Sequence, residues 1–381
     1  MTTPPDALRP LRARPARPAG AHAGRSVAAA LALAACAAVG TGSAPVAAGS
    51  HGADAEPFEI GIRAVEAVYR PLHGAFARSA GELDGAIGRF CDAPSTGARA
   101  AVEDAWSELV PSFAAIEPLR VGPLLEDNRI NRVFFWPDSR RAGERQLQAL
   151  LAETAPLDVD ALSAKSVAVQ GLPALERLLV GLADGGDPER ACRVARPAAA
   201  NVRDVAEALD AAWRAEDGIA RRTVRTPSDD PLFRTRTEVL RSLLTQLQAG
   251  LESLAGPKLG PVAEADARAA RALPFARSGR YGAFLRGNVD GLAALLLDAG
   301  IADAAEVAGE AKFEIANVRR LLAKLDGELA PDPTLRGAVS EEAIATAGAL
   351  RAGVLGIERL LVDRIAPALG TGTGFNSADG D

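Results

Sequence analysis

The sequence predicts an all-α protein built from two antiparallel helical bundles. Hydrophobic residues make up 48% of the chain and aromatic residues only 4%. Most of the apolar content is therefore Ala, Leu and Val, which favours packing of helix against helix. Apolar side chains recur at helical spacing from Glu59 onward, and no segment shows the sustained alternation of a half-buried strand. A short motif recurs in both halves, which predicts that the two bundles are related by an internal duplication.

The first residues of the chain are typical of an export signal. Several arginines between Arg9 and Arg25 precede the apolar run SVAAALALAAC. This run is too short to span a bilayer but suits the hydrophobic region of a signal peptide. It ends in LAAC at Cys36, which resembles the bacterial lipobox, whose cysteine is lipidated and becomes the mature N-terminus. Residues 1–36 are therefore predicted to be a signal peptide with a lipobox, and cleavage after Ala48 is the alternative.

Residues 37–57 are predicted to be a flexible tether, because they are rich in Gly, Ala, Ser and Pro and lack periodicity. A tether after a lipidated cysteine predicts an exported, periplasmic protein. Its lipid would anchor it to the bacterial envelope, at the outer rather than the inner membrane, so that the membrane is one partner. The formal net charge is −6 and no strongly basic stripe is present, which argues against a nucleic-acid partner.

Helical segments fill the rest of the chain. They are expected at residues 58–90, 96–117, 140–153, 159–182, 188–215, 233–255, 280–299, 301–328 and 340–368. The segment TVRTPSDDPLF carries two prolines and polar residues between long helices, which is typical of a linker. The predicted organisation is a first bundle at 58–222, a linker at 223–232, a second bundle at 233–370 and a C-terminal tail at 371–381.

The repeated motif is GLPALERLLV at 171–180 and GVLGIERLLV at 353–362. A glycine and the run Glu-Arg-Leu-Leu-Val occur at the same offsets in both copies. The match predicts that Glu176 and Glu358 are equivalent positions in two homologous bundles.

Glu176 lies on an apolar flank of its predicted helix, since Pro173 and Val180 share its stripe. An ionised carboxylate in such surroundings must be paired, coordinated or protonated. We expect its partner to be an arginine of the stretch 129–145, or else a bound metal or ligand. Pro173 follows Gly171, so the helix is expected to break at the glycine and begin again with the proline in its first turn.

The stretch from Ile116 to Leu147 is irregular, because three prolines prevent one straight helix. It concentrates six arginines around the run FFW, and loops carry function more often than scaffolds do. The residues predicted to line a ligand site between the bundles are Trp136, Asp138, Arg140, Gln170 and Glu176. The alternative is a surface crossover with buried aromatic side chains and solvated arginines.

Two cysteines, Cys91 and Cys192, remain if Cys36 carries a lipid. An oxidising periplasm favours their pairing. A disulfide between them would close a loop of about 100 residues and stabilise the fold by up to roughly 4–5 kcal/mol in the chain-entropy model. Two buried free thiols are the alternative.

Several motifs together resemble the imelysin family, an insulin-cleaving-metallopeptidase-like family, and most closely its branch of predicted periplasmic lipoproteins. They are FCDAP at 90–94, FFWPDSR at 134–140, KSVAVQGLPALERLL at 165–179, the helix around Cys192 and the tail GTGTGFNSADGD. The resemblance spans the whole mature chain. It implies duplicated helical bundles that face each other with a site between them. It also implies either metallopeptidase activity or a role in iron uptake.

One position departs from the family pattern. The family hallmark is Gly-x-His-x-x-Glu, and the matching residues here are Gly171, Pro173 and Glu176, so that proline stands in the histidine position. A catalytic zinc needs several protein ligands and a water molecule, but the mature region has only His51, in the tether, and His73. No classical zinc site is expected. A divalent metal or iron held by oxygen ligands that include Glu176 stays open.

The sequence therefore predicts an exported, non-catalytic binding protein. Its crevice between the bundles would hold a metal, a small ligand or an envelope protein partner, in a role linked to iron acquisition. One alternative is a metallopeptidase of the imelysin type. A structural envelope scaffold is the other.

Overall fold

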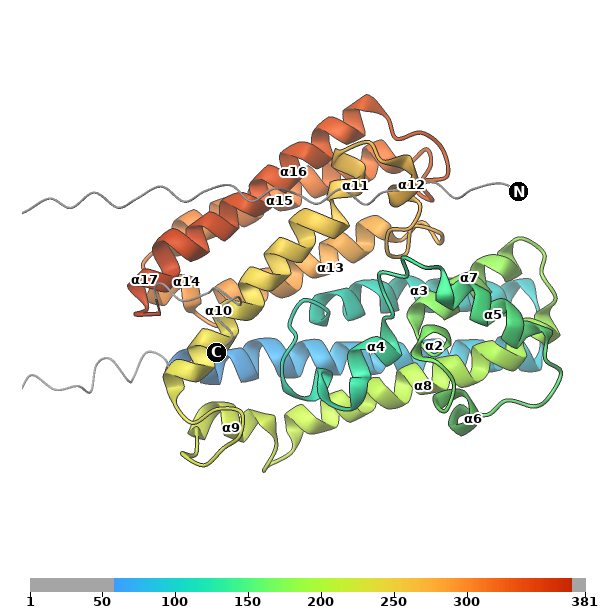
Figure 1. The fold of residues 1–381 in the computed structure, drawn as a ribbon, viewed down its shortest axis with the longest axis horizontal. Coiled ribbons are helices and arrows are strands. Elements are labelled where there is room, and N and C mark those ends of the chain that lie inside the picture. Colours follow the sequence, from blue (N-terminus) through green and yellow to red (C-terminus); the bar gives the residue numbers. More distant parts are fainter. Residues whose placement is uncertain (1–57, 372–381) are drawn as a thin grey trace, which may run out of the picture. The chain divides into compact units, whose positions relative to one another are not determined.

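A computed structural model describes residues 58–371, and all regular secondary structure in that range is helical (Figure 1). The predicted all-α class is confirmed. Cys36, His51 and the alternative cleavage position after Ala48 lie outside the described residues, as does nearly all of the predicted tail. Within 58–371, no helix has the length and apolar character needed to cross a membrane.

Three long helices organise the first part of the chain. They are α2 (Arg70–Asp92), α3 (Thr96–Ile116) and α8 (Pro188–Arg214), and α2 packs along both of the others (Figure 1). A π-helical turn, η1 (Ala64–Tyr69), leads directly into α2. Shorter helices join α3 to α8: η2 (Gly122–Leu124), η3 (Glu126–Asn128), α4 (Arg129–Val133), α5 (Ala142–Ala152), α6 (Val159–Ser163), η4 (Val167–Val169) and α7 (Leu172–Ala183).

Four long helices organise the second part: α10 (Arg236–Ser253), α13 (Tyr281–Ala293), α15 (Ala308–Leu329) and α16 (Glu341–Leu360). The capping box of Thr235 and Glu238 begins α10. The remaining short elements are α9 (Ile219–Arg225), η5 (Leu254–Lys258), α11 (Gly260–Ala263), α12 (Ala267–Ala270), η6 (Ala294–Asp298), α14 (Ile301–Ala304), η7 (Leu361–Ile365) and α17 (Ala366–Ala368).

Two of the predicted helices are interrupted. The segment expected at 159–182 divides into α6, η4 and α7, because the chain turns at Gly171 before α7 begins. A Cβ at Gly171 would lie 2.2 Å from the carbonyl oxygen of Val133, so only glycine fits this approach of two backbone segments. The segment expected at 301–328 divides into α14 and α15 at Glu306, whose φ is +57°.

Two hydrophobic cores fill the described part, and each takes side chains from the other part of the chain. The core around α2, α3 and α8 includes Phe275 and Phe284 from the second part. The core around α10, α13, α15 and α16 includes Tyr69 and Trp213 from the first part. The disulfide between Cys91 on α2 and Cys192 on α8 is present, which is the pair that the sequence predicts.

Helices α3 and α13 lie close together and join the two parts. A Cβ at Gly291 would lie 1.9 Å from the carbonyl oxygen of Ala115, and one at Gly287 would lie 2.5 Å from the Cβ of Ala114. The two glycines therefore let α13 lie directly against the backbone of α3. This contact fixes where α13 begins, and with it the position of the loop that precedes it.

A buried ion pair closes the same interface. Lys258 is 0% exposed and its Nζ donates to Glu117 Oε2 at 2.5 Å and to Asn288 Oδ1 at 2.7 Å. Glu117, directly after α3, also accepts from Arg120 at 2.6 Å. Asn288 on α13 donates to the carbonyl oxygen of Ala114 at 2.7 Å. Every member of the network thus has a partner, as a buried charge requires.

Burial alone would raise the pKa of the Glu117 carboxyl, but Lys258 and Arg120 together lower this pKa below its ordinary value. Because the folded-state pKa is lowered, ionised Glu117 contributes stability above its ordinary value of 4.5. That contribution is lost as the pH falls through the folded pKa. The pair was not predicted from the sequence, since its members lie far apart in the chain.

Replacing Lys258 with Met is expected to lower the free energy of unfolding by about 3–5 kcal/mol, because Glu117 would stay buried without its main counter-charge. Urea denaturation measures the change, and Lys312→Met, at an exposed lysine of α15, is the matched control. The double variant Glu117→Leu/Lys258→Met is expected to recover most of the loss. Equal stability of the Lys258→Met and Lys312→Met proteins would contradict a structural role for the pair.

Candidate functional site

Glu176 lies in the second turn of α7 and is 6% exposed. Its Oε1 accepts two hydrogen bonds from Ser278, one from the backbone N–H and one from Oγ, both at 2.9 Å. Ser278 belongs to the loop before α13, so the carboxylate links the two parts of the chain. The expectation of an arginine partner from 129–145 is wrong, because those arginines bond to nearer groups: Arg132, for example, donates to Asn201 and Arg141 donates to Glu144.

Burial raises the pKa of Glu176, and the two bonds from Ser278 and the charges of Arg177 and Arg277 only partly oppose it. The protein environment therefore favours the neutral carboxyl more than water does.

Pro173 lies in the first turn of α7, as expected from the sequence, and its carbonyl oxygen accepts from Arg177 at 2.9 Å. Proline at this position offers no side-chain ligand atom. Within residues 58–371, no group of three or more His, Cys, Asp and Glu side chains lies close enough together to hold a metal ion. The donor set around Glu176 therefore does not fit a peptidase metal site.

His73 is the histidine of the described range, and it is buried elsewhere in the fold. Its Nδ1 lies 2.8 Å from the carbonyl oxygen of Tyr69, and its ring packs beside the rings of Tyr69 and Trp213. Burial lowers the pKa of His73 to about 4, although the bond to Tyr69 and the charge of Asp210 oppose the shift. A neutral, packed imidazole has a structural role here.

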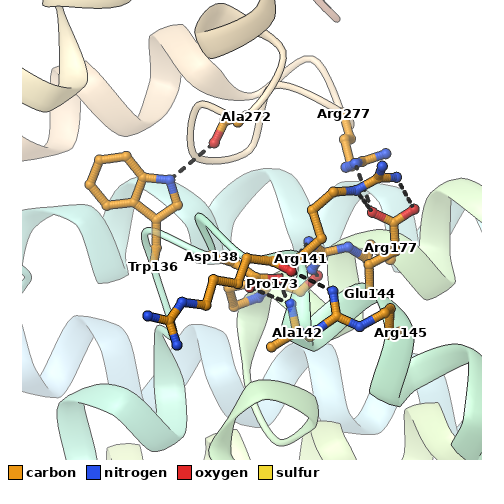
Figure 2. A network of polar contacts seen from close by, with 12 residues as sticks. Trp136, Asp138, Arg141, Ala142, Glu144, Arg145, Pro173, Arg177, Ala272 and Arg277 are labelled. Carbon is orange, nitrogen blue, oxygen red and sulfur yellow. Dashed lines mark hydrogen bonds and ion pairs between the residues drawn. The ribbon is translucent and has the colours of Figure 1, made fainter. Parts of the chain in front are cut away.

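The other predicted lining residues bond to different parts of the chain, and Figure 2 shows two of them, Trp136 and Asp138. Asp138 accepts from the N–H groups of Ala142 and Gly143 at 2.7 and 2.9 Å, and its carboxylate lies 3.7 Å from Arg177. Trp136 Nε1 donates to the carbonyl oxygen of Ala272 at 3.0 Å.

The hydrogen bonds of Arg140 and Gln170 involve backbone carbonyl oxygens. Arg140 is exposed, and its carbonyl oxygen accepts from Arg145. Gln170 is buried, and its Nε2 donates to the carbonyl oxygens of Ser163 and Lys165 at 3.0 and 2.7 Å. The five residues predicted to line a ligand site thus bond to different neighbours.

A pocket of about 330 Å³ is lined by both parts of the chain, and Ser278 is one of its lining residues. Its lining comes from α3, from the end of α7 and from the loops before α13 and α16: Glu103, Trp106, Leu179, Val180, Ala183, Asp184, Arg277, Ser278, Arg280, Thr334 and Arg336. None of the five predicted lining residues is among them. One sequence feature could have pointed to this pocket: the loop ARSGR at 276–280, in which two arginines flank a serine and a glycine directly before a helix.

A family model and solved structures are similar to this chain. Residues 69–353 match the family model described as Imelysin. An imelysin-like protein from Psychrobacter arcticum 273-4 is similar in structure, with a TM-score of 0.63 and 20% identity over 84% of this chain and 98% of that one. A protein of Parabacteroides distasonis assigned as an iron-regulated protein A precursor has a TM-score of 0.57 and 12% identity over 81% and 95% of the two chains. No curated protein matches the chain significantly.

Glu176→Gln is expected to change how stability depends on pH. A folded-state pKa raised above 4.5 means that the wild-type protein loses stability as the pH rises from 4.5 through that pKa. Gln keeps an acceptor for Ser278 and cannot ionise, so the variant should lack this loss and become relatively more stable towards neutral pH. Urea denaturation at a series of pH values measures the free energy of unfolding of the wild type and of the variant.

The control is Glu342→Gln, at an exposed carboxylate at the start of α16. Glu176→Ala should be about 1–3 kcal/mol less stable than Glu176→Gln at every pH, because neither variant ionises and only in the alanine variant do the donors of Ser278 lose their acceptor. Parallel pH profiles of wild type and Glu176→Gln would refute the assignment of a raised pKa.

Proposed function

Because the chain belongs to the imelysin family, we propose that it is an imelysin-like binding protein of the bacterial envelope that does not cleave peptides. The observation that carries the proposal is which residues occupy the family motif and what they contact. Pro173 occupies the histidine position, and Glu176 is committed to Ser278 as an acceptor in a buried contact. Proline supplies no ligand atom, and Glu176 already holds the loop through Oε1, which argues against the metal and water chemistry of a zinc peptidase.

The pocket between the two parts supports a binding role. Its volume is at the lower end of the range for small-molecule sites, and polar groups occur among its apolar walls. The pocket adjoins the contact between Glu176 and Ser278, so the altered motif supports one wall of it. Function in iron acquisition is part of the proposal, since one structural relative is assigned as an iron-regulated protein.

Purified protein is expected to show no chelator-sensitive cleavage of unfolded casein, and its zinc and iron content should be far below one equivalent per chain. Glu176→Ala should behave like wild type in both measurements, with Glu358→Ala as the control at the predicted equivalent position. Cleavage that EDTA abolishes and that Glu176→Ala lacks would overturn the proposal in favour of a metallopeptidase of the imelysin type.

We also propose that the protein is exported and anchored to the outer membrane by a lipid on Cys36. The order of basic residues, apolar run and LAAC supports this placement. In a bacterial host, Cys36→Ser is expected to move the protein from the membrane fraction to the soluble fraction, and mass spectrometry should find diacylglycerol on the N-terminal cysteine of wild type. A mature chain that begins at Gly49 and carries no lipid would support cleavage after Ala48 instead.

A further inference from the structure

A cluster of three aromatic rings joins the two parts of the chain at the start of α2. His73 is 1% exposed, and its ring packs beside Tyr69 and Trp213, which stack on each other with centroids 4.2 Å apart. Tyr69 and Trp213 belong to the core of the second part, and the Tyr69 hydroxyl donates to Gln246 Oε1 on α10 at 2.8 Å. This aromatic cluster therefore holds η1 and the end of α8 against α10.

The imidazole of His73 fits its site only without a positive charge. Its Nδ1 lies 2.8 Å from the carbonyl oxygen of Tyr69, which can only accept, so Nδ1 carries the hydrogen of the neutral ring. Within residues 58–371, Nε2 is buried and has no hydrogen-bond partner. A proton added to Nε2 would be a donor without an acceptor on a buried, charged ring, which is costly.

Asp210 on α8 offers a protonated imidazole a different partner. Its carboxylate accepts from Arg214 Nε at 2.9 and 2.8 Å, and its charge acts on His73. A Cβ at Gly74 would lie 3.3 Å from Asp210 Oδ1, so the ion pair lies against the turn of α2 that carries His73. An open pocket of about 490 Å³ brings solvent beside this turn, and its lining residues are Glu66, Arg70, Pro71 and Arg214.

The other charged groups near His73 do not offer it a free carboxylate. They are Arg70 and Arg78 on α2, Arg214 on α8 and Glu117 directly after α3, whereas α10 contributes the neutral Gln246. Arg70 is paired with Glu66, and Glu117 is paired with Lys258. The arginines repel an imidazolium ion, so the surroundings favour the neutral ring in the aromatic cluster.

The turn before α2 is the element that protonation would release. It is π-helical, since the N–H of Arg70 donates to the carbonyl oxygen of Val65, five residues earlier. Turns of this kind are rare and occur frequently at functional sites. Tyr69 is the last residue of η1, and its contacts with Trp213 and Gln246 hold the turn in place. Loss of these contacts would leave η1 free to rearrange.

We propose that His73 is a pH-sensitive switch: its neutral ring keeps η1 and the start of α2 closed against α8 and α10, and its protonation opens this junction as the ring moves towards Asp210. The inference does not depend on the proposed binding function.

The direction of the pH dependence follows from burial. Burial lowers the folded-state pKa of His73 from 6.5 to about 4, and Asp210 only partly opposes this shift. The closed junction therefore keeps its full stability above pH 6.5 and loses it as the pH falls from 6.5 towards 4.

Hydrogen exchange of the full mature chain at pH 7.5 and pH 5.0, measured by mass spectrometry and corrected for the intrinsic exchange rate, tests the switch. Peptides from residues 64–75 and 209–215 are expected to lose protection about tenfold or more at pH 5.0, because each unit of pKa difference changes the opening equilibrium tenfold. Peptides from residues 84–92, at the disulfide end of α2, should keep their protection.

His73→Phe keeps a buried ring and cannot be protonated, so its protection should be the same at both pH values. Asp210→Asn removes the charge that favours the imidazolium ion and should move the midpoint of the change to lower pH. Asp204→Asn, at an exposed carboxylate of α8, is the matched control and should leave the midpoint unchanged.

Circular dichroism at pH 7.5 establishes that each variant folds, and the midpoint of Asp210→Asn tests the switch even if His73→Phe does not fold. Wild-type protection that stays unchanged at pH 5.0, an equal loss of protection in His73→Phe, or an unshifted midpoint in Asp210→Asn would overturn the switch.

Discussion

The ion pair of Glu117 and Lys258 joins the end of α3 to the turn after α10, and the placement of the second part of the chain on the first depends on it. Asn288 extends the pair to α13, whose glycines already lie against the backbone of α3. A buried ion pair adds little net stability over an apolar contact, but it tolerates only one geometry. The ion pair therefore selects one register between these helices, whereas apolar packing alone would allow several.

That register determines what lies next to Glu176. The loop between α12 and α13 follows from the position of α13, and it brings Ser278 to the carboxylate of Glu176. In this chain the glutamate of the family motif joins α7 to the loop before α13, because its Oε1 accepts both hydrogen bonds from Ser278. The same contact presents Arg277 and Arg280 to the pocket.

Features local to the sequence could be predicted. Gly171 and Pro173 predicted the break before α7, since the conformational limits of both residues act within a few positions. The apolar stripe around Glu176 predicted its burial. The partner of Glu176 could not be predicted, because a serine in a loop some hundred residues later carries no periodic signal. Trp106 resembled any other core aromatic residue, and only the packed fold shows that its N–H lacks an acceptor.

The sequence by itself determined the helical class, the joint at Gly171, the family and the loss of the histidine ligand, because composition, periodicity and residue identity are properties of the chain alone. The tertiary structure decided the ion pair that sets the helix register, the partner of Glu176 and the pocket that both parts of the chain line. These depend on the approach of segments distant in the chain. A side chain's hydrogen-bond partners and dielectric surroundings exist only once those segments have packed together.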